Sequence, residues 1–277
     1  MGKLTFRAVV WGVLVLTPLA SSTSIKKPHY REKSVAGVRP RAGSGPVVVN
    51  AASFENGISP GGLATIFGTD LTSVSEVVVA SRFPLPTILA DVSVLVDGVP
   101  APIYSIAFAN GEDQISFQVP YDARTGPRAV QIEVFDGRDR TASIIADSFT
   151  EDPGIFAYRG DYALAVHSSD GALVGPDDPA FPGEVLVLYV TGLGPLSLDL
   201  QDGYAAPSSP LAYTVDPFTV LVDGEGSEIF FSGLAPGFVG LYQINFRVPR
   251  DVRAGNLNLE IQSPYASSRI AILPVQQ

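Results

Sequence analysis

The chain has 277 residues, 27 glycines, 23 prolines, no cysteine and a formal net charge of −10. This length is enough for two domains of ordinary size. The absence of cysteine excludes disulfides, thiolate metal sites and lipid attachment through an N-terminal cysteine. From Pro46 onward, ten arginines and no lysine face 27 acidic residues. A body this acidic repels phosphate backbones, so we expect no nucleic-acid partner.

Residues 1–24 have the pattern of a secretory signal peptide. Lys3 and Arg7 lie at its start, and an apolar run and a small-residue cleavage region follow. The apolar run is shorter than the roughly 20 residues of a membrane span, so no transmembrane segment is expected in the mature chain. Residues 25–46 carry six basic side chains against Glu32 alone, which predicts a disordered basic tether. We therefore expect a secreted, periplasmic or cell-surface protein.

Beyond the tether, the sequence predicts short strands joined by turns. In the first half these strands lie at 47–50, within 60–71, at 114–119, at 130–134 and near 143–146. Ile115, Phe117 and Val119 alternate with polar residues, which is the period-two pattern of a half-buried strand. Asp97-Gly98 follows an apolar run, and Asp-Gly is a strong hairpin signal because both residues tolerate positive φ.

The second half repeats this pattern. V-L-V-D-G occurs at 94–98 and again at 220–224, an offset of 126 residues, and Q-I-x-F-x-V-P occurs at 114–120 and again at 243–249, an offset of 129. A three-residue insertion therefore lies between the two motifs of the second copy.

Between the copies, Pro153-Gly154 predicts a turn at the boundary. The sequence thus predicts an all-β chain of two tandem immunoglobulin-like β-sandwich domains related by internal duplication. We place the first repeat at 47–157 and the second at 158–277.

Several motifs together resemble a known family. They are N-A-A-S-F at 50–54, L-P-T at 85–87, Q-I-S-F-Q-V-P at 114–120, P-G-I-F at 153–156, Y-V-T-G-L-G-P at 189–195, G-Y-A-A-P at 203–207 and G-L-A-P-G-F-V-G-L-Y-Q-I-N-F-R-V-P at 233–249. From residue 47 to the end, the chain resembles the uncharacterised C-terminal domain first noted in Solibacter and common in secreted acidobacterial proteins. That family has no established activity and no assigned catalytic residues. Its members usually end large exported proteins, behind propeller or immunoglobulin-like repeats, whereas only a short tether precedes the domain here.

Catalytic serine chemistry requires a base, and the chain contains only His29, in the tether, and His167. Ser168, Ser169 and Asp170 follow His167 directly. Residues adjacent in sequence rarely form a triad, and no G-x-S-x-G elbow is present. We therefore interpret His167 as a structural histidine beside a turn and predict no catalytic residue.

Paired carboxylates could support glycoside hydrolysis. Acids considered for that role are Glu112, Asp113, Glu184 and Glu228, but any acidic protein offers such pairs. The only tryptophan, Trp11, lies in the predicted signal peptide, which disfavours a sugar-stacking platform. Tyrosines that could still serve as one are Tyr104, Tyr204, Tyr213 and Tyr265.

Acidic loops could also hold calcium, since calcium prefers hard oxygen ligands. They are Glu112-Asp113, Asp177-Asp178 and Asp199-x-x-Asp202-Gly203. None has the twelve-residue calcium-loop pattern, so turn formation is the favoured interpretation and we predict no metal or cofactor. Gly192–Pro195 is not a phosphate-binding loop either, because no lysine or helix follows it.

The preferred hypothesis is a non-catalytic exported module that binds or adheres through loops at the ends of the sandwiches. Its partner would be an unknown protein or glycan at the cell surface. The alternatives are a carboxylate-based carbohydrate-active hydrolase and a purely structural spacer of a larger assembly. Fold alone does not choose among the three.

Overall fold

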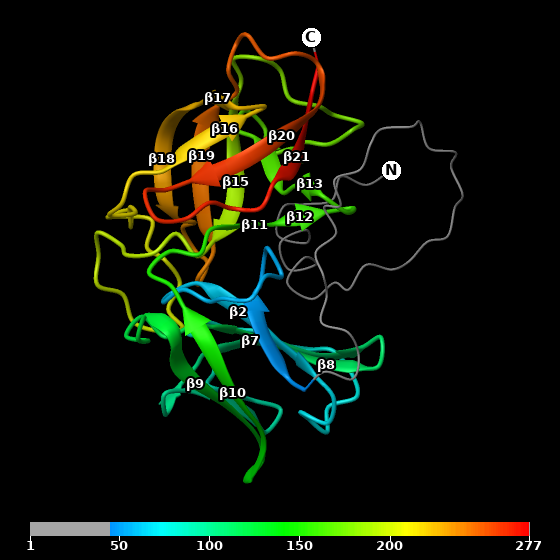
Figure 1. Cartoon of the computed structure of the whole chain (residues 1–277), viewed down its shortest axis with the longest axis vertical. Coiled ribbons are helices and arrows are strands. Elements are labelled where there is room, and N and C mark those ends of the chain that lie inside the picture. Colours follow the sequence, from blue (N-terminus) through cyan, green and yellow to red (C-terminus); the bar gives the residue numbers. More distant parts are fainter. Residues whose placement is uncertain (1–44, 277) are drawn as a thin grey trace.

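The computed structural model describes residues 45–276, which form strands, turns and loops without a helix (Figure 1). The predicted signal peptide, and the predicted tether except Gly45 and Pro46, lie outside the described residues. Within 45–276 the protein has no helix with the length and apolar character that a membrane crossing requires. The predicted all-β class is confirmed for this part of the chain.

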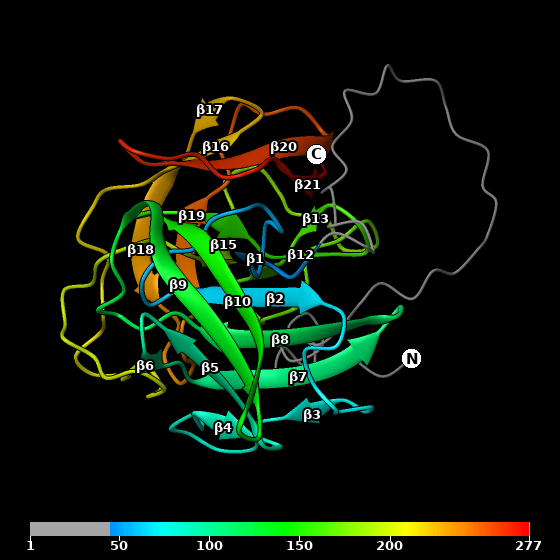
Figure 2. The same cartoon turned by 60° about the horizontal axis from the view of Figure 1, so that its bottom comes forward.

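Strands β1 to β10 form two sheets, which we call the first repeat (Figure 2). One sheet has the order β1 (Val47–Asn50), β2 (Leu63–Gly68), β8 (Glu112–Gln118), β7 (Ile103–Ala109) and β3 (Val78–Val79). The other has the order β10 (Asp139–Ser148), β9 (Gly126–Asp136), β5 (Val92–Val96) and β4 (Ile88–Leu89), with β6 (Val99–Pro100) paired to β5. Ile66 and Phe117 of one sheet share a buried apolar cluster with Val94 and Ile132 of the other. The two sheets therefore pack as a sandwich.

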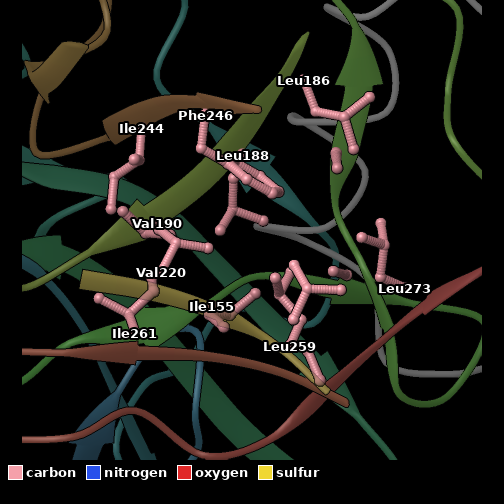
Figure 3. Close-up of a cluster of buried hydrophobic side chains, with 14 of the residues drawn as sticks. Ile155, Leu186, Leu188, Val190, Val220, Ile244, Phe246, Leu259, Ile261 and Leu273 are labelled. Carbon is pink, nitrogen blue, oxygen red and sulfur yellow. The ribbon is translucent and has the colours of Figure 1, made fainter. Parts of the chain in front are cut away.

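Strands β11 to β21 form the second repeat, again with two sheets, so the strands of this repeat begin at Gly154, before the expected start at residue 158. One has the order β11 (Gly154–Ile155), β15 (Val185–Thr191), β19 (Tyr242–Arg247) and β18 (Glu228–Leu234), with β14 (Ala165–His167) paired to β15. The other has the order β12 (Ala157–Tyr158), β13 (Tyr162–Ala163), β21 (Ala271–Val275), β20 (Gly255–Gln262), β16 (Thr219–Val222) and β17 (Glu225–Gly226). Leu188 and Phe246 from one sheet meet Val220 and Leu259 from the other in the core (Figure 3).

The strand registers show the duplication directly. Ala64 of β2 pairs with Phe117 of β8, and Leu186 of β15 pairs with Phe246 of β19. On the other side, β1 pairs with β2 as β14 pairs with β15, so Asn50 and His167 hold equivalent positions opposite Ala64 and Leu186. Two tandem immunoglobulin-like sandwiches related by internal duplication were predicted, and this fold is confirmed.

The two Asp-Gly hairpins are also confirmed. Asp97 and Gly98 have φ of 51° and 81° between β5 and β6, and Asp223 and Gly224 have φ of 53° and 89° between β16 and β17. Positive φ at both central residues is the type I′ geometry that two-residue hairpins favour, because its twist matches that of the strands.

The predicted turn at Pro153-Gly154 is wrong, because Gly154 begins strand β11 and pairs with Thr191. A side chain at Gly154 would collide with the Oδ1 atom of Asn50. The glycine therefore permits a close approach between the two repeats and does not form a turn.

The two repeats meet through a buried apolar contact, which we call the interdomain junction. Its side chains are Ala51, Ala52, Leu63, Ala80, Leu85 and Tyr104 from the first repeat and Phe156, Leu164, Val166, Tyr189, Ala235, Val239 and Leu241 from the second. Hydrogen bonds cross it as well: the Leu63 N–H donates to Thr191 Oγ1 at 2.8 Å, and the Gly203 N–H donates to Gln118 Oε1 at 2.7 Å. Figure 1 shows the repeats stacked along the long axis of the molecule, with β2 and β11 near the junction.

Candidate binding surface

His167 lies at the end of β14 and is 6% exposed. Its Nδ1 is 2.6 Å from Glu184 Oε1, and its Nε2 is 3.3 Å from the carbonyl oxygen of Asp178. Burial alone would lower the pKa of His167, but the hydrogen bonds and negative charges of Glu184 and Asp178 together outweigh burial and raise it above its ordinary value. Both ring nitrogens thus contact protein groups, while Ser168 and Ser169 are exposed. The histidine therefore holds the connection between β14 and β15 against the end of β14.

Of the four carboxylates considered for hydrolysis, Glu112 and Asp113 lie in the first repeat and Glu184 and Glu228 in the second. Three of the four have protein partners. Glu184 Oε2 also accepts a hydrogen bond from the Phe181 N–H at 3.0 Å. Buried Asp113 accepts one from the Leu71 N–H at 2.8 Å, and exposed Glu228 lies 3.1 Å from Arg247 Nε. Glu112 precedes Asp113 at the start of β8. These contacts give three of the four carboxylates structural roles.

The loops considered for calcium have structural contacts too. Asp177 Oδ2 lies 3.7 Å from Arg159 Nη1. Asp202 Oδ1 accepts a hydrogen bond from the Tyr121 N–H at 2.9 Å. Asp199 is exposed. Among residues 45–276, no group of three or more histidine, aspartate or glutamate side chains is spaced to hold a metal ion.

The four tyrosines considered for sugar stacking divide into two groups. Tyr104 is buried in the interdomain junction, where its hydroxyl donates to the Val239 carbonyl oxygen at 2.7 Å. Tyr204, Tyr213 and Tyr265 are 50%, 47% and 74% exposed. Tyr213 also packs on Phe231, with ring centroids 5.2 Å apart.

A β-bulge in β18 builds the surface around Tyr213. Ile229 and Phe231 of β18 pair with the adjacent residues Phe246 and Asn245 of β19, so Phe230 is an extra residue in the strand. A bulge changes the direction in which side chains leave a strand. Here Phe230 is 48% exposed, and the Arg247 guanidinium lies over its ring at 5.1 Å from the ring centre.

We define the aromatic face as Tyr213, Glu228, Phe230, Phe231 and Arg247. Polar side chains border this face. Gln243 Nε2 donates to Asn245 Oδ1 at 3.1 Å, and both residues alternate with core residues along β19. A ligand at this face would therefore meet apolar rings, one cation, one anion and amide groups within one sheet.

The equivalent surface of the first repeat is covered. Strand β7 has its own register shift between Ile103 and Ser105, which makes Tyr104 the counterpart of Phe230. Gln118 pairs with Leu63 as Arg247 pairs with Val185, so these two residues correspond as well. In the first repeat both counterparts are buried and bond to Val239 and Gly203 of the second repeat.

In the second repeat, Phe230 and Arg247, which correspond to Tyr104 and Gln118, remain accessible to solvent. The sequence analysis places binding in loops and singles out two residues of this face, Tyr213 as a stacking ring and Glu228 as a carboxylate, without bringing them together. One signal was present: Ile229-Phe230-Phe231 interrupts the alternation expected of a half-buried strand.

The class that these sheets define is a pair of immunoglobulin-like β-sandwich domains. No family model and no curated protein matches the chain. Among solved structures, it is similar to SGBP-B of the Bacteroides ovatus mixed-linkage glucan utilization locus, in complex with a mixed-linkage heptasaccharide, at 11% identity and a TM-score of 0.32. That match covers 80% of this chain and 44% of the other, so the chain spans less than half of that protein.

Two further likenesses are to immunoglobulin-type pairs. One is to the titin domains Z1Z2 in complex with telethonin, with 15% identity, coverage of 83% of this chain and 96% of that one, and a TM-score of 0.20. The other is to the tandem Ig repeats of Dlar, with 10% identity, coverage of 83% and 97%, and a TM-score of 0.17. Likenesses of this strength carry no information about a ligand or an activity.

Proposed function

We propose that the protein is a non-catalytic exported binding module, secreted, periplasmic or held at the cell surface after its signal peptide is removed. Its ligand, a protein or a glycan, would bind the aromatic face. One observation carries this proposal: the first repeat buries the equivalent face against a neighbouring domain, whereas the second repeat leaves Phe230 48% exposed. Exposed aromatic rings beside a cation are frequent energetic centres of binding sites.

The non-catalytic part of the proposal is supported by the contacts of the acids. A carboxylate-based hydrolase needs two carboxyl groups that are accessible to a substrate, but Glu184 is held by His167 and the Phe181 N–H. An activity screen on polysaccharides with Glu184→Gln and Glu228→Gln variants separates this alternative. Turnover that either substitution abolishes would replace the binding proposal with the hydrolase.

The binding test compares three variants with the wild-type mature chain. Immobilised protein is exposed to cell-envelope and matrix fractions and to defined neutral polysaccharides. We expect Phe230→Ala and Tyr213→Ala to abolish retention of the bound component. Phe108→Ala, which removes a ring that is 50% exposed in the first repeat, is the control and should leave retention unchanged.

Two results would contradict the proposal. One is that no component is retained, and the other is that a retained component binds all three variants equally. In the first case, the native mass of the purified chain tests the structural-spacer alternative, because a spacer acts through assembly with other copies or chains.

The resemblance to the Solibacter-type family belongs to this proposal too. Membership would agree with export, because members of that family usually end large exported proteins.

A further inference from the structure

The aromatic face occupies the outer side of three neighbouring strands, β15, β19 and β18, which lie side by side (Figure 1). Gln243, Asn245 and Arg247 of β19 alternate with core residues, so they mark three successive positions on this outer side. Strand and residue spacings make the face on the order of 200 Å². A stable protein–protein interface needs about 800 Å² from each partner. The face is therefore too small to hold a folded protein by itself, but it can hold a few sugar rings.

The edge of β18 is also closed to an extended peptide. The Thr214 N–H donates to the Ser232 carbonyl oxygen at 3.0 Å. The Leu234 N–H donates to the Ala212 carbonyl oxygen at 2.9 Å, so one end of this edge already has a partner segment. At the other end, the bulge at Phe230 disrupts the regular ladder that an added strand would need. Recognition of a peptide by strand addition is therefore disfavoured.

The charges of the face compensate each other. Arg247 Nε lies 3.1 Å from Glu228 Oε2, and Arg247 Nη1 donates to the Gly183 carbonyl oxygen at 2.8 Å. The same guanidinium covers one side of the Phe230 ring. From Pro46 onward, the 27 acidic residues against ten arginines repel an anionic ligand as well. A ligand without charge suits this surface.

Two amide side chains supply hydrogen-bonding groups beside the rings. Gln243 Nε2 donates to Asn245 Oδ1 at 3.1 Å. In the part of the chain that the structure describes, this bond leaves the Gln243 Oε1 acceptor and the Asn245 Nδ2 donor without a protein partner. A sugar hydroxyl both donates and accepts, so an acceptor and a donor side by side can bind adjacent hydroxyls of one sugar. The C–H groups on the face of a sugar ring can pack on an aromatic ring, whose face is negative.

We propose that the aromatic face binds an uncharged polysaccharide. This inference rests on the proposed function and narrows its ligand from a protein or a glycan to a neutral glycan. The rings of Tyr213 and Phe230, which are 47% and 48% exposed, stack on the sugar, while Gln243 and Asn245 bond its hydroxyls. Tyrosine and phenylalanine take the stacking role because Trp11 is the only tryptophan of the chain.

Affinity electrophoresis of the mature chain in native gels tests the inference. The neutral probes are hydroxyethylcellulose, laminarin and galactomannan, and the acidic probes are alginate and polygalacturonate. We expect at least one neutral polymer to retard the protein and neither acidic polymer to do so. The affinity for the retarding polymer should change less than about twofold between about 0.05 and 0.5 M sodium chloride, because no ion pair forms with the ligand.

Substitutions locate the contact. Gln243→Ala and Asn245→Ala should each weaken the affinity for the retarding polymer about 3–10-fold, which corresponds to the loss of one hydrogen bond. Phe230→Ala and Tyr213→Ala should abolish the retardation, because the stacking surface is lost. Gln131→Ala, which truncates an exposed glutamine of β9 in the first repeat, is the matched control and should bind as the wild type does.

Two outcomes would overturn this inference and leave the binding module in place. One is that no neutral polymer binds, while a protease-sensitive component of the cell envelope is retained and Phe230→Ala releases it. The other is retardation by an acidic polymer that high salt abolishes.

Two further outcomes would contradict the inference and the assignment of the aromatic face together. In one, a neutral polymer retards the wild type and all four variants of the face equally. In the other, no polymer retards the protein and no envelope component is retained.

Discussion

Single polar side chains hold several segments of this protein together. Asn50 Oδ1 accepts hydrogen bonds from the N–H groups of Ala52 and Ser53 at 2.9 and 3.1 Å, while its Nδ2 donates to the Asp152 carbonyl oxygen at 2.7 Å. His167 holds the equivalent position of the second repeat and also uses both ends of its side chain. The last residue of β1 and the last residue of β14 thus each hold the loop that follows their own strand.

The contact between His167 and Glu184 predicts a pH dependence. The pKa of His167 is raised in the folded state, because Glu184 and Asp178 together outweigh the effect of burial. A raised histidine pKa adds stability that is fully present below the unfolded-state pKa of about 6.5 and is lost as the pH rises through the folded-state pKa. His167→Gln should therefore lower the unfolding free energy more at about pH 5.5 than at about pH 8.5, as measured by urea denaturation. An equal loss of unfolding free energy at both pH values would mean that the charged form of His167 adds no stability.

Core phenylalanines give a second prediction at this scale. Phe117 and Phe246 correspond in the two repeats, and both are fully buried. Replacing either with alanine should cost about 3–5 kcal/mol of unfolding free energy, because a cavity remains in a packed core. Phe108→Ala, on an exposed side chain, should cost about 0.5 kcal/mol or less. Denaturant melts of the three variants provide the measurement, and losses below about 1 kcal/mol at both core sites would contradict it.

At the scale of the element, the local patterns in the sequence predicted the strands well. Alternation placed Ile115 and Ile244 in the cores, where both are fully buried, and Asp-Gly placed two hairpins correctly. The turn predicted at Pro153-Gly154 is wrong because a glycine suits both a tight turn and a position where another segment packs closely against the backbone. The packing of Asn50 against Gly154 shows that the second case applies here. The aromatic face depends on a bulge, which arises from pairing with β19 and is not encoded by alternation within β18.

The two hairpin glycines are testable with a matched control. Gly98 and Gly224 have positive φ, yet a Cβ at either would meet no atom within 4 Å. Alanine there should cost about 1–2 kcal/mol from backbone strain alone. Gly226 has the same open surroundings without a positive φ, so Gly226→Ala should be neutral or slightly stabilising. Thermal melts of the three variants separate backbone strain from packing, and equal effects at all three sites would contradict this account.

On the scale of the whole molecule, several of the sequence motifs from the two halves converge on the interdomain junction. Asn50, Leu85, Gly203 and Val239 come from four different motifs, and each takes part in a contact between the repeats, with Asn50 lying against Gly154 and Gly192. Each repeat could be predicted from its own pattern. Which faces meet could not, because that depends on complementarity between segments more than 100 residues apart, such as Tyr104 and Val239, which are separated by 135 residues.

The junction predicts that the two repeats unfold together. Thr191 is fully buried, and its hydroxyl accepts from the Leu63 N–H at 2.8 Å and donates to the Gly240 carbonyl oxygen at 2.9 Å. Thr191→Val keeps the shape but leaves both backbone groups without that partner, which should cost about 1–3 kcal/mol. Thr214→Val, at the partly exposed edge of β18, is the control and should cost about 1 kcal/mol or less.

Calorimetry distinguishes a shared junction from two independent domains. In one cooperative unit, Thr191→Val moves a single transition to lower temperature, because the stability of each repeat includes the contact with the other. In two independent domains, the wild type already shows two transitions, and the substitution affects at most one of them. We expect the first result, since apolar burial and hydrogen bonds cross the junction together. The aromatic face would then be held by a rigid two-domain body, with no hinge between the repeats to reorient it.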